Sequence, residues 1–316
     1  MSGAERHTIH ALGTECSLVG YGVSPSAKAT EIFTTLIQRM DATASRFRSD
    51  SEIQRVFDGK PRSGEVISPL LFEALEAALF GAEITQGYLD PTVACSLVAM
   101  GYEKDFLRVP AKVSGTARDV KVAFPAGFRN IRLNHSDHSV SISAGVNLDL
   151  GSTGKAFLAD KIRETIESEI SETVLVNLGG DISASAVADR AAWPIKITDD
   201  ASLDASSKGI IIPIFGGGIA TSSVTWRAWQ ISPEKTYHHI VDPHTGISAN
   251  SPFASVTVLA GSALHANIAS TGTIAMGEKG EEWLVSTGLP ALARMRDASI
   301  KYFGPWDRTI VEEAPA

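Results

Sequence analysis

Residues 146–155 constrain the fold of this chain more than any other stretch. Apolar residues alternate up to Leu150, which predicts a strand, and four small residues then predict a tight turn. Beyond the turn, apolar residues recur at every fourth position, which predicts an amphipathic helix over residues 155–170. Ser152 or Thr153 is expected to cap this helix, so that other first-turn N–H groups can face a ligand.

The start of this helix has the properties of an anion site. A helix N-terminus followed at once by a lysine, Lys155, favours an anion, and phosphate is the usual one. Asp149, just before the turn, would repel phosphate unless its carboxylate contacts a ribose, a base or a metal ion. The combination favours a nucleotide site. The alternative is an ordinary strand-to-helix connection with a surface lysine, and the spacing differs from the phosphate-binding loop G-x-x-x-x-G-K-[ST].

Composition places the chain among soluble globular proteins and excludes some partners. Its 316 residues are 44% hydrophobic and 20% charged, with a formal net charge of −8. This acidic balance argues against a general nucleic-acid or anionic-membrane surface. Cys16 and Cys95 stand apart from any zinc-type cluster, so both are expected to be reduced thiols. No apolar run approaches ~18 residues and no signal-peptide or lipoprotein motif is recognised, so a cytoplasmic location is expected.

Hydrophobic periodicity predicts helices and strands in mixed order, which favours an α+β fold over a doubly wound sheet. Helices are expected over residues 26–44, 69–86, 155–170, 266–277 and 278–287. Strands are expected over residues 6–22 (interrupted at Gly13), 174–178, 193–198, 209–214, 219–222, 225–231 and 253–260, with short strands between 120 and 150 around a turn at 134–137. The glycines at 216–218 are interpreted as a plain loop, and Asp50 or Ser51 is expected to cap a short helix.

Residues 238–246 read His-His-Ile-Val-Asp-Pro-His-Thr-Gly, and the last five are typical of a tight turn. In the functional interpretation, His239 lies at a strand end beside the Asp242 carboxylate, placed for acid–base chemistry. The alternative is a structural histidine next to a turn. His238 is expected to face solvent, because adjacent strand residues point in opposite directions. A zinc site of His238, His239 and His244 is a weaker alternative, because their spacing matches no standard ligand pattern.

Asn267 and Thr271 are four residues apart in a predicted helix, so their side chains share one face. Their two oxygens could hold Mg²⁺, with a backbone carbonyl and phosphate oxygens completing the coordination. The alternative is a helix start with small polar residues. The Gly-Gly-Asp sequence ending at Asp181 either allows the backbone to approach a ligand closely or forms a turn without one.

Taken in order, these segments resemble the FAD:protein FMN transferase family, the ApbE-like flavin transferases, from about residue 10 to residue 295. The matching segments are residues 12–14, 45–53 (Ser-Arg-Phe-Arg-Ser-Asp-Ser-Glu-Ile), 87–92 (Gly-Tyr-Leu-Asp-Pro-Thr), 149–155, 177–181, 220–222, 239–246 and 266–271. The resemblance rests on their number and order. It implies mixed sheets flanked by helices around an active-site cleft, in a single catalytic unit over residues 1–316 that can include a smaller subdomain around residues 95–145.

The resemblance also implies an activity and its residues. Such enzymes bind FAD and Mg²⁺, break the pyrophosphate, release AMP and attach FMN to a threonine or serine hydroxyl of an acceptor protein. By motif position, the residues that would contact FAD are Leu12, Phe47, Tyr88, Leu89, Asp90, Asp149, Lys155 and Ile240. The metal would be bound by the Ser152 main-chain carbonyl and the side chains of Asn267 and Thr271. His239 and Asp242 would lie near the reacting phosphate as catalytic residues.

One position departs from the pattern of that family, which commonly has aspartate where this chain has Asn267. The loss of a full charge beside a divalent ion weakens their attraction by roughly 1–4 kcal/mol. Another carboxylate, such as Asp149 or Asp242, could compensate. The substitution leaves two further hypotheses open: a Mg²⁺-dependent FAD pyrophosphatase that releases FMN and AMP, and an FAD-binding protein without enzymatic activity.

Overall fold

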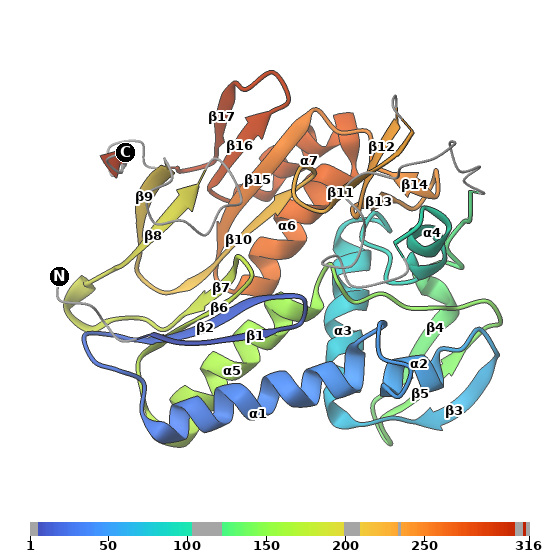
Figure 1. The fold of residues 1–316 in the computed structure, drawn as a ribbon, viewed down its shortest axis with the longest axis horizontal. Coiled ribbons are helices and arrows are strands. Elements are labelled where there is room, and N and C mark those ends of the chain that lie inside the picture. Colours follow the sequence, from blue (N-terminus) through green and yellow to red (C-terminus); the bar gives the residue numbers. More distant parts are fainter. Residues whose placement is uncertain (1–5, 103–121, 199–208, 233–234, 307–311, 314–316) are drawn as a thin grey trace.

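The computed structural model describes residues 6–102, 122–198, 209–232, 235–306 and 312–313. Its largest element is an antiparallel sheet that contains strands from near both ends of the chain. Within these residues, eight strands pair in the order β1-β2-β6-β7-β10-β15-β16-β17 (Figure 1). Their bounds are β1 Arg6–Ala11, β2 Thr14–Gly20, β6 Val174–Leu178, β7 Asp181–Ala184, β10 Gly217–Ser223, β15 Phe253–Ala260, β16 Ala291–Met295 and β17 Ile300–Phe303. The expected α+β class is confirmed.

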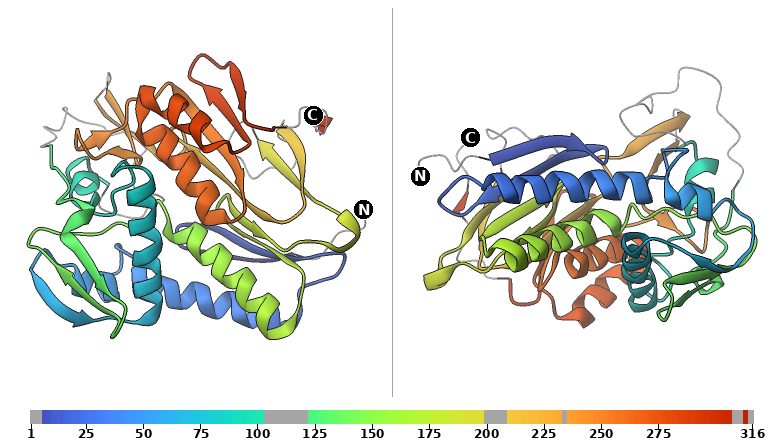
Figure 2. Two further views of the ribbon diagram at one scale, coloured as in Figure 1. Left: turned by 180° about the vertical axis from the view of Figure 1, so that it is seen from behind. Right: turned by 90° about the horizontal axis from the view of Figure 1, so that it is seen from below.

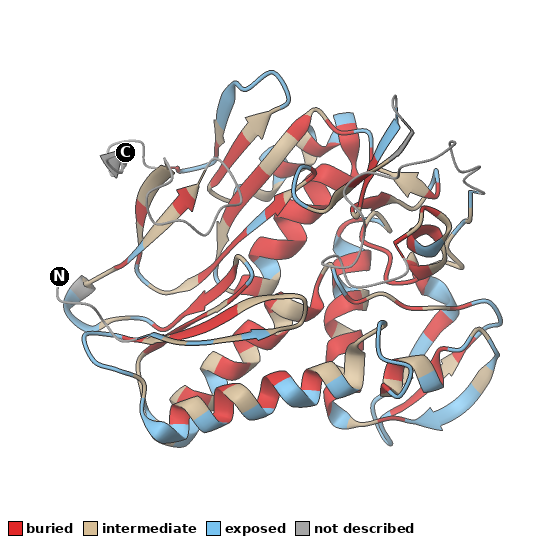
Figure 3. Cartoon of the chain, viewed as in Figure 1, coloured by how far each residue is buried: buried red, intermediate tan, exposed pale blue. Residues whose placement is uncertain are grey.

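Helices cover one face of this sheet (Figure 2). They are α1 (Ala27–Ala44), α5 (Gly154–Ile170), α6 (Ala263–Ala275) and α7 (Gly280–Thr287). α5 packs on β6 and β7, α6 packs on β10 and β15, and α1 lies along α5. Leu158, Ile162 and Ile166 of α5 are fully buried, as their four-residue spacing predicts. The outer face of α1 is largely exposed, whereas that of α5 is mostly of intermediate exposure (Figure 3).

A small sheet covers part of the opposite face. It consists of β8 (Trp193–Thr198), β9 (Gly209–Ile214) and β18 (Glu312–Glu313). Trp193 and Ile212 of this sheet share an apolar cluster with Leu175 of β6. The neighbours of Leu175 on β6, Val174 and Val176, belong instead to the cluster on the helix side. β6 is therefore buried on both faces, which explains why its sequence is almost continuously apolar.

The remaining elements lie beside one end of the sheet (Figure 1). They are α2 (Glu52–Val56), β3 (Arg62–Val66), α3 (Pro69–Ile84), α4 (Ala94–Ala99), β4 (Ile131–Asn134), β5 (Ser139–Ile142), β11 (Ala228–Ser232), β12 (Lys235–His238), β13 (Val241–Asp242) and β14 (Ile247–Ser248). Single 3-10 turns occupy Phe128–Asn130, Ala188–Arg190 and Gly277–Lys279. Ser51 caps α2 by accepting a hydrogen bond from the Gln54 N–H, as expected.

Two expectations about secondary structure are wrong. Residues 146–150 form no strand: alternate side chains are buried, but the backbone N–H of Asp149 donates to Pro91 O (2.8 Å) and not to a sheet. Gly217 and Gly218 open β10 and are not a loop. A Cβ at Gly218 would lie 2.1 Å from Ala263 N, so only glycine lets the start of α6 lie against this strand.

In the part of the chain that the structure describes, no helix is long and apolar enough to cross a membrane.

Candidate active site

The turn before α5 and the first residues of that helix, together called the Lys155 corner, bring backbone and side-chain donors together. α5 begins at Gly154, and Thr153 occupies the N-cap position. Neither Thr153 nor Ser152 caps the helix as the sequence suggested: the N-cap has no side-chain hydrogen bond, and within the described residues the buried Thr153 Oγ1 has no partner. The first-turn N–H groups of this helix are therefore not capped by a side chain, which keeps the corner suited to an anion.

A chain of three polar side chains links α5 to β7 and α6. Lys155 Nζ lies 3.1 Å from Asp181 Oδ2, and Asn267 Nδ2 donates to Asp181 Oδ1 over 2.8 Å. The Asp181 side chain is only 5% exposed. A buried carboxylate requires this kind of pairing, because desolvation otherwise disfavours its charge. Asp181 thus holds Lys155 and Asn267 in one arrangement although the three residues are far apart in sequence.

The predicted metal ligands on α6 face the same region. Asn267 and Thr271 are each 6% exposed and lie on one helix face. Because Asn267 Nδ2 donates to Asp181, its Oδ1 points elsewhere, and in the described structure this buried oxygen has no hydrogen-bond partner. Thr271 Oγ1 lies 2.6 Å from Ser222 Oγ of β10. An unpartnered buried oxygen is costly unless a ligand binds it, so these residues fit a hard cation.

A cavity of about 360 Å³ opens beside this corner. Four of the predicted FAD contacts, Leu12, Phe47, Asp149 and Lys155, line it together. A cavity of this size with mixed apolar and charged walls suits part of a nucleotide-sized ligand. The structure therefore brings together residues from the start of the chain, the segment after α1 and the turn before α5.

Arg46 explains how Asp149 can lie beside an anion site. Its Nε forms an ion pair with Asp149 Oδ2, while Asp149 Oδ1 accepts a hydrogen bond from Gly151 N (2.7 Å). The guanidinium carbon also lies 4.1 Å from the centre of the Phe47 ring and 4.6 Å from that of Tyr102. Asp149 is thereby neutralised within the cavity wall and no longer repels phosphate as the sequence alone suggested.

His239 is next to a residue of the cavity wall, because its backbone N–H donates to Arg227 O over 3.2 Å. Burial lowers its pKa well below 6.5, and the nearby charges of Arg227 and Lys155 lower this pKa further. Both cations line the cavity, whereas His239 does not. Its buried Nδ1 has no hydrogen-bond partner among the described residues. A buried neutral imidazole close to two cations is a weak base, and an anionic ligand that offsets those charges would increase its affinity for a proton.

His238 is buried, contrary to the expectation that it faces solvent. It is 6% exposed, and its Nε2 lies 3.0 Å from Ala249 O. Strand β12 ends at His238, so strand alternation does not extend to His239. The zinc alternative is also wrong, because no group of three metal-ligating His, Cys, Asp or Glu side chains occurs in the described ranges. The His244 ring faces Asp242 and Tyr88 instead.

The other predicted site residues do not line the cavity. The Asp90 carboxylate is buried and accepts hydrogen bonds from Thr92 and from the Phe128 N–H. Asp242 Oδ1 accepts from the His244 N–H (3.0 Å) within its turn. Tyr88 packs its ring against His244, Leu89 and Ile240 belong to an apolar cluster that includes α6, and Ser152 lies in the turn before α5.

Several charged and aromatic residues of the site were not predicted from the sequence. Arg46, Tyr102 and Arg227 line the cavity, and Asp181 binds Lys155 and Asn267. Arg46 and Asp181 stand inside motifs that the sequence already singled out, so their charge was a usable signal. Tyr102 and Arg227 belong to no such motif, and only the fold brings them to the cavity.

His238 gives a testable pH dependence of stability. Burial lowers its pKa from 6.5 to about 4, so the unfolded state binds a proton first as the pH falls. Its contribution is fully present above about pH 6.5 and is lost as the pH falls towards 4. His238→Gln keeps a donor for Ala249 O but has no titrating ring. We expect this substitution to lower the slope of the free energy of unfolding against pH by up to about 1.4 kcal/mol per pH unit between pH 6.5 and 4. Urea denaturation across this window measures it, with the exposed His244→Gln as control; equal slopes in all three proteins would contradict the prediction.

The fold and the site together define a class of protein: an α+β protein with a basic cavity beside a helix N-terminus and buried polar side chains on a neighbouring helix. Comparison with known proteins identifies the class further. The chain matches the ApbE family over residues 12–293. It is 28% identical to the FAD:protein FMN transferase of Treponema pallidum over 84% of this chain and 77% of that protein, and 25% identical to that of Escherichia coli over 86% and 78%.

Solved structures agree on the fold. The apbe protein from Thermotoga maritima superposes with a TM-score of 0.77 at 24% identity, covering 95% of this chain and 96% of that one. The Pseudomonas stutzeri flavinyl transferase ApbE in its apo form gives a TM-score of 0.78 at 20% identity, covering 97% and 96%. The chain belongs to the ApbE family.

Proposed function

We propose that this chain is a FAD:protein FMN transferase, which moves FMN from FAD to a threonine or serine hydroxyl of an acceptor protein and releases AMP. The curated relatives carry that name. The observation that carries the proposal is the meeting of Lys155, at the start of α5, with an aromatic and apolar cavity wall. Such a corner can bind the diphosphate while the wall receives a planar ring.

In this proposal, different residues stabilise the charge of the diphosphate, bind a ring system of FAD and accept the proton of the acceptor hydroxyl. Lys155 and the positive end of the α5 dipole stabilise charge on the diphosphate. Leu12 and Phe47 form the surface for a ring system of FAD. His239 would take the proton from the acceptor hydroxyl, because its imidazole is neutral and a bound diphosphate would offset the charges of Lys155 and Arg227. The Asp242 carboxylate accepts a hydrogen bond from the His244 N–H. We therefore propose that Asp242 holds the turn after His239 in shape and thereby positions His239.

The residues present fit a divalent cation. The Ser152 carbonyl, Asn267 Oδ1 and Thr271 Oγ1 would hold Mg²⁺, whose charge would offset that developing on the phosphate oxygens. The carrying observation is the buried Asn267 Oδ1, which has no partner in the described structure. Leu89 and Ile240 share an apolar cluster with Ile268 of α6, which supports a role in positioning this helix. Direct contact of Leu89, Ile240, Tyr88 and Asp90 with FAD stays a prediction.

One assay separates the three possible activities. The protein is incubated with FAD, Mg²⁺ and an acceptor protein, and the products are followed by in-gel flavin fluorescence and by chromatography of AMP and FMN. Fluorescent acceptor with one AMP per flavin supports transfer. Release of AMP together with free FMN, and no labelled acceptor, would support a pyrophosphatase; FAD binding without AMP would support a binding protein. The matched control is the same acceptor with alanine in place of its reactive hydroxyl residue.

A further inference from the structure

The cavity is positively charged although the whole chain carries a net charge of −8. Its basic wall residues are Arg46, Arg48, Lys155 and Arg227, and its acidic ones are Asp41 and Asp149. Asp149 is paired with Arg46, and Asp41 is paired with Arg48. Lys155 is paired with Asp181, so within the described residues Arg227 is the basic wall residue that forms no ion pair. A cavity of this charge attracts an anion and gives a free cation no assistance.

Asp149 and Asp242, the two carboxylates considered as substitutes for the missing charge at residue 267, each have partners in the described structure, although only Asp149 has a cationic one. Asp149 is held by Arg46 and the Gly151 N–H, and Asp242 by His244. Asp181 lies beside Asn267, but its two oxygens contact Lys155 and the Asn267 amide. The nearest negative charge is therefore neutralised by a lysine. What Asp181 does supply is orientation, because by accepting from Nδ2 it turns Asn267 Oδ1 away from itself.

The oxygens offered to a cation are consequently all neutral: an amide, a hydroxyl and a main-chain carbonyl. We infer that a divalent cation enters this site together with the FAD diphosphate, and that the ligand-free protein binds the cation only weakly. The missing charge of residue 267 is provided by the substrate itself. This inference rests on the proposed function, since it takes the diphosphate of FAD as the anion that binds at the Lys155 corner.

The inference predicts a specific effect of Asn267→Asp. The new carboxylate would add a negative charge beside the neutral ligands and create a cation site in the absence of FAD. We expect the affinity of the ligand-free protein for Mn²⁺ to rise at least about tenfold. The same carboxylate would face Asp181 across the present 2.8 Å hydrogen bond, so the metal-free variant should melt at a lower temperature than the natural chain.

The test measures Mn²⁺ binding directly, from the loss of the electron paramagnetic resonance signal of the free aqueous ion. Flavin-free protein is titrated with Mn²⁺, and the titration is repeated with saturating FAD, with FAD alone as blank. Asn134→Asp, the same chemical change at the exposed end of β4 where Asn134 Oδ1 accepts from Ser136, is the matched control. We expect weak binding to the ligand-free natural chain and to this control, and binding at least about tenfold tighter with FAD or in ligand-free Asn267→Asp.

Equal Mn²⁺ affinity with and without FAD would overturn the inference, and so would equal affinity of the natural chain and Asn267→Asp without FAD. If Asn267→Asp does not fold, the comparison of the natural chain with and without FAD still decides. Cooperative binding of Mn²⁺ and FAD without labelling of any acceptor would support the inference while contradicting the transferase function. Failure to bind FAD under all conditions would overturn both.

Discussion

Lys155→Ala is expected to weaken FAD binding about 100-fold and to reduce FMN transfer at least as much. A charge-assisted hydrogen bond to a buried group contributes about 1.5–3 kcal/mol, and its loss accounts for most of this effect. A second contribution comes from Asp181, which is 5% exposed and would lose its cationic partner. Its uncompensated carboxylate would then lie close to the incoming diphosphate. Titration of FAD, followed by flavin fluorescence, measures the affinity.

Two further variants separate these contributions. Lys161→Ala removes a lysine from the same helix that pairs with Glu73 of α3 and does not line the cavity, so it should bind FAD normally. The double variant Lys155→Ala/Asp181→Asn removes the uncompensated carboxylate and should recover part of the lost affinity. If Lys155→Ala bound FAD as tightly as the natural chain, the start of α5 would not be the anion site.

The parts of the fold that the sequence predicted are those set by local periodicity and capping. α1 and α5 begin and end within one residue of the expected positions, because their apolar residues recur with the helical period over more than four turns. The same applies to Ser51, whose cap depends on residues three positions away. The corner at Lys155 was recognisable for a similar reason: a small turn, a lysine and a helix start are adjacent in the chain.

The features that could not be predicted from the sequence depend on contacts between residues that are far apart in the chain. Residues 146–150 alternate like a strand, but the backbone pairs with Pro91 and not with a neighbouring strand. Asp149 does not repel phosphate as its position in the sequence suggested, because Arg46, which belongs to a different motif, pairs with it in the folded chain. Asp181 and Asn267 are likewise 86 positions apart in the chain. Pairings of this kind depend on topology, which periodicity does not contain.

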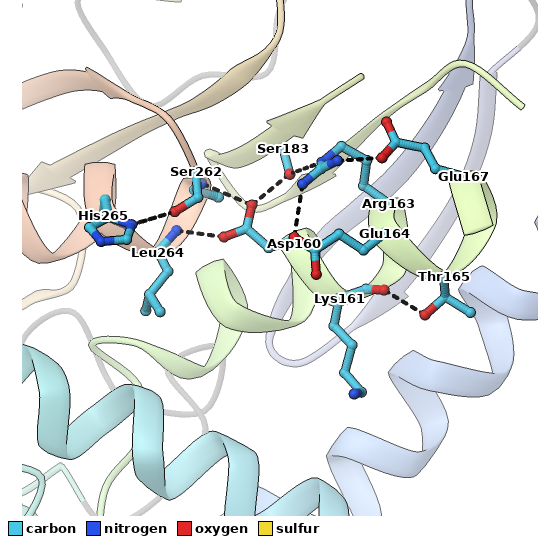
Figure 4. A network of polar contacts seen from close by, with 11 residues as sticks. Asp160, Lys161, Arg163, Glu164, Thr165, Glu167, Ser183, Ser262, Leu264 and His265 are labelled. Atoms are coloured by element: carbon cyan, nitrogen blue, oxygen red, sulfur yellow. Dashed lines mark hydrogen bonds and ion pairs between the residues drawn. The ribbon is translucent and has the colours of Figure 1, made fainter. Parts of the chain in front are cut away.

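Asp160→Ala is expected to lower the free energy of unfolding by about 3 kcal/mol, the largest stability effect predicted for a residue outside the cavity. Asp160 of α5 is buried and accepts hydrogen bonds from Ala263 N (2.9 Å), Leu264 N (2.9 Å) and Ser183 Oγ (2.6 Å). Figure 4 shows this carboxylate between β7 and the start of α6. It thus satisfies two N–H groups of α6 that the helix itself cannot, and its charge favours that helix end.

Removal of this carboxylate would leave three donors without this acceptor, two of them buried, and Asp160→Asn should cost less because one oxygen remains. Glu164→Ala, at an exposed position on the same helix, is the matched control and should change stability by less than about 0.5 kcal/mol. Urea denaturation measures all three variants.

The hydrogen bonds of Asp160 between α5 and α6 also set the spacing between Lys155 and Asn267, so Asp160→Asn, if folded, should weaken the FAD-dependent binding of Mn²⁺. If a destabilised Asp160→Asn variant bound Mn²⁺ normally, the contacts of Asp181 alone would be sufficient to hold Lys155 and Asn267 at their present spacing.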